Sequence, residues 1–161
     1  MLTLKPRDMT RSTATALDDT AIEAFLADRS MGTLSLAKEN ESYAVPVSFT
    51  FDSGDRDFYF RLGYAPGSRK REFIDATDRA TFVVAAEAEA GWTSVLAHGT
   101  LEHRSAVDDL NTHRPADGSL PQADREHEIP FYHVFDAPDA TTFALVRLRT
   151  DELTGVTEAA D

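Results

Sequence analysis

Residues 42–51 read SYAVPVSFTF, and this stretch decides the expected fold. Its odd-numbered positions are all large and apolar, whereas its even-numbered positions are small or polar. Because strand side chains alternate between two faces, this period predicts a β-strand with one core face and one open face. Proline has no amide N–H to donate, so Pro46 predicts a sheet edge, a bulge or the rim of a ligand cleft at this point.

Similar short alternating segments lie on both sides of this stretch. Polar turns at residues 38–41 and 52–55 join the first three as antiparallel hairpins. The predicted strands cover residues 32–36, 42–51, 58–62, 80–86, 93–103 and 141–149.

Helical signals are fewer. Apolar residues at helical spacing predict a helix from Leu17 to about Arg29, and a second helix begins at Ser68. Hairpins with a few short helices indicate a mainly β, mixed α+β domain built as an antiparallel barrel or sandwich. Further helices are predicted at residues 105–113 and 129–135, with a surface loop at 114–128, a flexible arm at 1–15, one domain at 16–156 and a tail at 157–161.

Composition narrows the classes of protein. The 161 residues include no cysteine and no apolar run of membrane-spanning length, so we expect a soluble, cytoplasmic protein without disulfides or thiolate chemistry. The net charge of -12 disfavours nucleic acid and anionic membranes as partners. Lysine is rare and Asp outnumbers Glu, a balance that suits a salt-rich, halophilic source; an acidic mesophilic protein is the alternative.

A cluster of cations opens the second predicted helix, where the chain reads Ser68-Arg69-Lys70-Arg71. Helix N-termini favour negative charge because their first N–H groups are unpaired and the macrodipole is positive there. A phosphate bound at Ser68 would offset the cations and accept hydrogen bonds from Arg69 or Lys70. The alternative is a solvated basic patch that pairs with surface acids.

Three further features of the sequence bear on a ligand or metal site. The single tryptophan, Trp92, begins a predicted strand beside Ser94 and suits either a core position or a planar cofactor at a sheet rim. Gly99, inside the same strand, indicates a bulge or a close approach by another group. His127 and His133 match no compact ligand spacing, so no metal site is predicted.

Taken in order, these segments resemble the FMN-binding split-barrel family, in its pyridoxamine-phosphate-oxidase-like and nitroimidazole-resistance-like branch. The resemblance spans roughly residues 17–101. It is carried by Gly32-Thr33-Leu34, Tyr43 to Phe49, Phe58-Tyr59-Phe60, Gly67 to Lys70, and Trp92 to Val95 with Gly99.

The resemblance implies a six-stranded Greek-key split barrel that forms a homodimer, with FMN in clefts between the subunits. It also implies a small-molecule redox substrate. The residues that it places at the flavin are Val45, Pro46, Val47 and Ser48 at the ring and ribityl chain, Ser68, Arg69 and Lys70 at the phosphate, and Arg61, Trp92 and Ser94 nearby. No catalytic residue is implied, because the flavin itself carries the redox chemistry.

Three functions stay open at this point. The first is an FMN-dependent oxidoreductase, the second a split-barrel reductase that uses the deazaflavin F420, and the third a non-catalytic flavin- or haem-binding protein. The C-terminal residues 151–161 lack the Arg and His of the substrate motif that pyridoxamine phosphate oxidases carry. Oxidation of vitamin B6 is therefore not expected.

Overall fold

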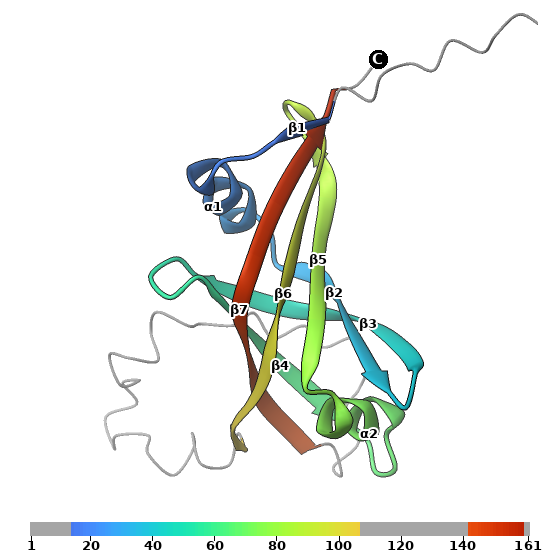
Figure 1. Cartoon of the computed structure of the whole chain (residues 1–161). Coiled ribbons are helices and arrows are strands. Elements are labelled where there is room, and N and C mark those ends of the chain that lie inside the picture. The colour runs from blue at the N-terminus through green and yellow to red at the C-terminus, as the bar shows by residue number, and fades with distance from the viewer. Residues whose placement is uncertain (1–13, 107–141, 160–161) are drawn as a thin grey trace, which may run out of the picture.

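The computed structural model describes residues 14–106 and 142–159, in which all strands join one antiparallel sheet (Figure 1). The mainly β fold with short helices is confirmed. In chain order the elements are β1 (Ala14–Ala16), α1 (Asp19–Ala27), β2 (Met31–Lys38), β3 (Glu41–Asp52), β4 (Asp57–Tyr64), α2 (Arg69–Ala76), β5 (Arg79–Ala88), β6 (Gly91–Ala106) and β7 (Thr142–Glu158).

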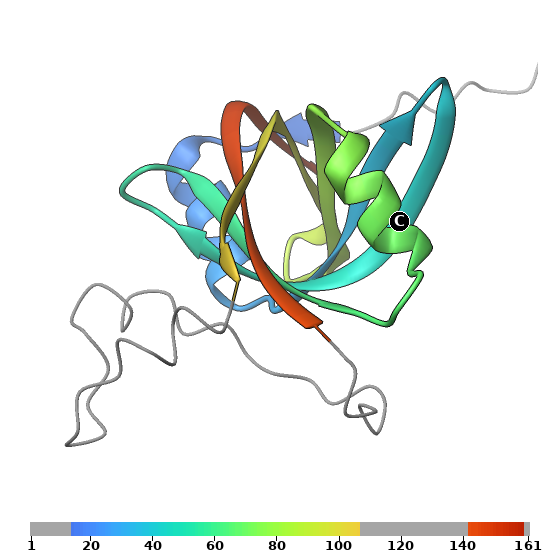
Figure 2. The same ribbon diagram turned by 90° about the horizontal axis from the view of Figure 1, so that it is seen from below.

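The sheet has the order β1-β7-β4-β3-β2-β5-β6, and pairing of β6 with β7 closes β2 to β7 into a ring (Figure 2). Hairpins connect β2, β3 and β4, and β5 then returns to lie beside β2, which is the Greek-key arrangement. The sheet has seven strands, whereas six were expected. The additional strand, β1, lies outside the ring and pairs with the last residues of β7.

The pair β6 and β7 is longer than its sequence pattern indicates. β6 runs to Ala106, so the helix expected from residue 105 is wrong at its first two residues. β7 continues to Glu158, into the expected tail at 157–161. A register shift follows His98, where a Cβ on Gly99 would lie 2.0 Å from the Arg149 carbonyl oxygen, so the predicted close approach is confirmed. Residues 107–113, 114–128 and 129–135 lie outside the described residues.

Aromatic side chains fill the interior of the ring. Phe58 and Phe60 from β4 meet Phe82 from β5 with ring centroids 5.1 and 4.8 Å apart, in edge-to-face geometry. Phe49 of β3 joins them at 5.2 Å from Phe82. These rings are almost fully buried, and each buried aromatic side chain contributes a large apolar area to stability.

The two helices occupy different ends of the ring (Figure 1). Asp18 caps α1 by accepting a hydrogen bond from the Ala21 amide at 2.8 Å, and Ile22 and Leu26 are buried. The predicted first helix is therefore confirmed. At the other end, α2 buries Phe73 and Ile74 against the strands. The candidate site lies at this second end.

A buried ion pair joins β4 to β7 on the outside of the ring. Asp57 is 4% exposed and accepts a hydrogen bond from Arg147 Nε at 2.8 Å. The other Asp57 oxygen accepts from the Thr150 amide at 2.9 Å. Because removal of one partner leaves a buried charge and donors without an acceptor, such a pair holds the strands in register.

We predict that Asp57→Ala lowers the free energy of unfolding by about 2–3 kcal/mol, measured by urea denaturation. The control is Asp55→Ala. Its exposed carboxylate lies 3.6 Å from Arg147, so its loss costs less than about 1 kcal/mol. Equal losses for the two variants would contradict a special role for the buried pair.

Candidate functional site

The site begins where β3 changes its neighbour. Residues 41–48 of β3 pair with β2, whereas the ladder with β4 covers only residues 49–52 of β3. Beyond this point β4 pairs with β7 alone. One edge of β3 therefore has no paired strand along residues 41–48, and Pro46 lies on this edge segment as its missing N–H predicts.

A tight turn leads from β4 into α2. The Ser68 amide donates to the Ala65 carbonyl at 3.1 Å, and Gly67 adopts a φ of +69°, a left-handed conformation that glycine reaches at little cost. Ser68 is the N-cap of α2, as predicted, but its hydroxyl makes no capping hydrogen bond. This hydroxyl and the first amides of α2 can therefore serve a ligand.

Two of the three cations at the start of α2 have acidic partners. Arg69 forms an ion pair with Glu41 of β3, and its guanidinium lies 5.4 Å from the centroid of the Phe73 ring. Arg71 lies 3.8 Å from Asp75, one turn further along the helix. For these two residues the alternative, a basic patch paired with surface acids, describes the structure.

Lys70 differs from both arginines. It is half-buried, and its Nζ donates to the Gly63 carbonyl at 3.3 Å. Among the described residues it forms no ion pair with a carboxylate, and burial alone lowers the pKa of its ammonium group. Gly63 lies two residues after Arg61 on β4, so both cations border the part of β4 that β3 has left. An anion bound beside this half-buried ammonium would stabilise its charged form.

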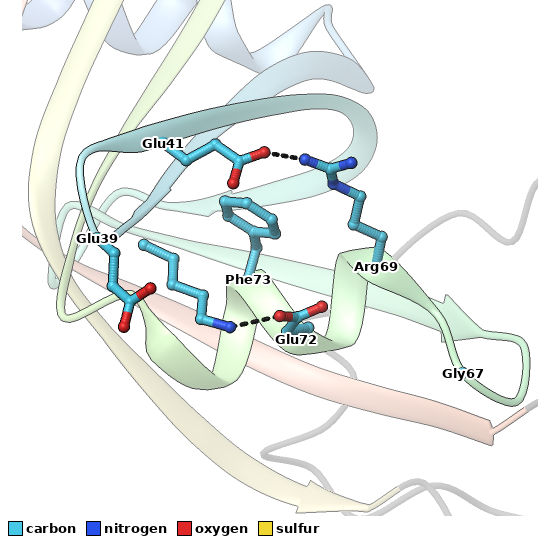
Figure 3. Close-up of a pocket in the computed structure, with 7 residues that line it drawn as sticks. Glu39, Glu41, Gly67, Arg69, Glu72 and Phe73 are labelled. Carbon is cyan, nitrogen blue, oxygen red and sulfur yellow. Dashed lines mark hydrogen bonds and ion pairs between the residues drawn. The ribbon is translucent and has the colours of Figure 1, made fainter.

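An open hollow lies beside α2 and the β2–β3 turn (Figure 3). Glu72 of α2 is held by the Lys38 ammonium, whose hydrogen bond lowers the pKa of the Glu72 carboxyl. Sequence analysis missed Glu41 and Glu72 as members of the site, because their partners Arg69 and Lys38 lie 28 and 34 residues away in the chain. The hollow is lined by Lys38, Glu39, Glu41, Gly67, Arg69, Glu72 and Phe73.

The structure divides the residues expected at the flavin ring. Val47 is 4% exposed and belongs to the core, and Val45 packs against that core, so only their backbone faces the strand edge. Pro46 and Ser48 alternate with them and lie on the outer face. The Ser48 hydroxyl donates to Met31 Sδ at 3.2 Å.

Trp92 and Ser94 lie on the outer face of β6, well separated along the sheet from the start of α2. Trp92 is 54% exposed, so the core alternative for this side chain is wrong. Ser94 pairs with Val156 on one side and Ala85 on the other. Within one chain the structure does not bring these two residues to Ser68, Arg69 and Lys70.

The outer face that carries them has an unusual composition. Along the paired strands, the outward positions of β2, the first part of β3, the middle of β5 and the first part of β6 carry no acidic side chain, Arg or Lys. In a chain with 44 such residues among 161, a sheet face of this kind is not an ordinary solvated surface. Its residues are Met31, Thr33, Ser35, Ala37, Ser42, Ala44, Pro46, Ser48, Thr81, Val83, Ala85, Trp92, Ser94, Leu96 and His98.

A buried threonine holds α2 in place against β2. The Thr77 hydroxyl accepts from the Ala37 amide at 3.1 Å and lies 2.6 Å from the Phe73 carbonyl oxygen, to which it donates. Thr77 is 6% exposed, and its backbone amide also donates to the Phe73 carbonyl, at 3.0 Å. The position of Lys70 relative to the strands rests on this contact and on Phe73, which stacks on Tyr43 at 5.0 Å.

The described residues were also compared with the requirements of a metal site and of a membrane-spanning helix. In residues 14–106 and 142–159, no three His, Asp or Glu side chains converge as a metal site would require. His127 and His133 lie outside this part of the chain. Neither of the two described helices has the length and hydrophobicity to cross a membrane.

Comparison with known proteins identifies the family. The family model of pyridoxamine 5'-phosphate oxidase matches residues 18–157. The chain belongs to this family. The match includes the closed ring, the edge of β3 and the start of α2, whereas no curated protein sequence matches the chain.

Several solved structures have a similar fold. A FAD-binding protein from Mesorhizobium loti is 20% identical, covers 92% of this chain and 99% of its own, and has a TM-score of 0.59. A FAD-binding protein from Mycobacterium smegmatis is 19% identical, with coverage of 89% and 98% and a TM-score of 0.57. A candidate 5-nitroimidazole resistance protein from Bacteroides thetaiotaomicron is 14% identical, with coverage of 92% and 91% and a TM-score of 0.58.

We predict that Thr77→Val lowers the free energy of unfolding by about 1–3 kcal/mol, because the Ala37 amide loses its acceptor. Thr100→Val, an exposed position on β6, is the matched control and changes stability by less than about 0.5 kcal/mol. The measurement is urea denaturation followed by tryptophan fluorescence. A Thr77 variant as stable as the control would show that the hydroxyl does not hold α2.

Proposed function

We propose that the chain is an FMN-dependent oxidoreductase that binds the flavin phosphate at the start of α2. The observation that carries this proposal is Lys70, a half-buried ammonium without an acidic partner among the described residues. Family membership and the neighbours named as FAD-binding proteins support a flavin as the ligand.

The residues at the start of α2 fit a phosphate. The Ser68 hydroxyl, the unpaired amides of the first turn and the Lys70 ammonium supply donors and positive charge at one place. The unpaired edge of β3 would face the flavin ring, through the backbone around Val45 and Val47 and the small side chain of Ser48. A bound flavin supplies the electron transfer, and the protein binds and orients it.

We also propose that a second copy of the chain covers the uncharged outer face. Four strands, β2, β3, β5 and β6, contribute to this face, and its exposed apolar side chains include Met31 and Trp92. Burial of such a surface removes apolar area from water without the desolvation of charged groups. A homodimer would bring Trp92 and Ser94 of the partner to a flavin that the same chain's β6 cannot reach.

The first test is the spectrum and mass of the ligand released from the purified protein. We expect FMN. If a deazaflavin or haem is released, that ligand replaces FMN in the assignment. If the protein neither carries a chromophore nor binds an added one, the flavin function is rejected. Oxidation of NADH or NADPH in the presence of an electron acceptor then tests whether the flavoprotein is an enzyme.

A substitution tests the phosphate site. Lys70→Met keeps the aliphatic length but removes the charge, so we expect the Kd for FMN to rise about 10- to 100-fold, as for the loss of a charge-assisted hydrogen bond. The Kd for riboflavin, which lacks the phosphate, should stay unchanged. Arg71→Gln is the control, because Arg71 pairs with Asp75 and should leave both affinities near the wild type.

A charge on the outer face tests the homodimer. Leu96→Asp should convert the dimer to a monomer in analytical ultracentrifugation, because a buried carboxylate without a partner opposes association. Thr100→Asp lies on the same strand but between Arg79 and Arg149, outside the uncharged face, and should leave the dimer intact. A dimer that survives Leu96→Asp would place the interface elsewhere.

A further inference from the structure

Arg69 and Lys70, two cations at the start of α2, are held by different contacts. Among the described residues Lys70 has no acidic partner, and its Nζ donates only to the Gly63 carbonyl, so no carboxylate there competes with a ligand for the ammonium. Arg69 is already engaged with Glu41. Lys70 can therefore bind a phosphate directly, whereas Arg69 must leave Glu41 before it can bind one.

The acids beside Arg69 are not equivalent. Glu72 is bonded to Lys38, which has the largest effect on its pKa, whereas Arg69 acts on Glu72 only as a nearby charge with a smaller effect. Glu39 also lines the hollow, but Figure 3 shows it turned away from Arg69 and without an ion pair to it. Glu41 therefore competes directly for the guanidinium.

The contact between Glu41 and Arg69 is exposed and therefore easily exchanged. Their side chains are 60% and 59% exposed, and pairs of this kind contribute little to stability. The guanidinium also lies 5.9 Å from the Tyr43 ring and 5.4 Å from the Phe73 ring. These ring contacts need no carboxylate, so Arg69 can keep them while it exchanges Glu41 for another anion.

We propose that Glu41 is a specificity-determining residue that competes with the ligand's phosphate for Arg69. This inference rests on the proposed flavin function and adds to it a regulation of phosphate affinity. The competition acts only on ligands that carry the phosphate, because a ligand without one makes no demand on Arg69. Glu41 thus lowers the preference for FMN over riboflavin below the value that the cations alone would produce.

The test compares FMN and riboflavin affinities of the full chain by fluorescence titration. Glu41→Gln should tighten FMN binding about two- to fivefold, the scale of an exposed ion pair, with riboflavin unchanged. Glu39→Gln is the matched control: it removes the same charge from the same rim without releasing Arg69, so its effect on FMN should be smaller than that of Glu41→Gln.

A double-mutant cycle isolates the contact. In an Arg69→Gln background, Glu41→Gln should no longer change the ratio of FMN to riboflavin affinity, because no guanidinium remains to release. A Glu41→Gln effect that persists in that background, equals that of Glu39→Gln, or weakens FMN binding would overturn the inference. Thermal melting of each variant confirms that the fold is intact.

These outcomes are distinct from failure of the proposed function. If the wild-type chain binds neither FMN nor riboflavin, the flavin function falls and the inference falls with it. If the wild type binds FMN and Lys70→Met weakens it while Glu41→Gln changes nothing, the flavin function stands and only the role of Glu41 is rejected.

Discussion

The change of partner within β3 is the constraint on which the rest of the structure depends. A ring of six strands closes only if each strand pairs on both sides somewhere, yet β3 meets β4 over four residues and then leaves it. The divergence creates an unpaired backbone edge where Pro46 is tolerated. It also leaves room at the end of the ring for the turn after β4 and for α2.

The packing of α2 against β2 and β3 places the cations of its first turn beside the unpaired edge of β3. Thr77 and Phe73 attach the helix to β2 and β3, and this attachment directs the first turn of the helix toward the exposed part of β4. Lys70 is half-buried as a result, and burial makes an unpaired ammonium unfavourable. A fully exposed ammonium would be stabilised by water. Because the fold removes part of this water from Lys70, a bound anion would stabilise its charge.

The charges of the chain are distributed unevenly over the barrel. Ion pairs gather on the outer side of β4, β6 and β7 around Arg147, and also around α2. The outward positions of β2, the first part of β3 and the middle of β5 carry no acidic side chain, Arg or Lys. An acidic chain repels its own copies, so a neutral face restricts where two copies can approach. The same barrel thus separates a polar ligand end from a face suited to association.

Many local features followed from residues close together in the sequence. Alternation predicted β2 to β5, apolar residues at helical spacing predicted α1, and Ser68 was expected to begin the second helix, α2. The ordered set of motifs was sufficient to predict the family. The length of β6 and β7 was underestimated, because an antiparallel pair extends as far as its partner continues, and this depends on a segment distant in the chain.

Residues close together in the chain were sufficient to predict the mainly β fold, the start of α2 and the excess of positive charge there. Which of these cations has no acidic partner among the described residues depends on the tertiary structure. Glu41 reaches Arg69 because the β2–β3 turn lies beside α2, and Lys70 is half-buried because it packs against the end of β4. Ion pairing and burial depend on distances in space, and residues 28 positions apart show no local pattern that reveals them.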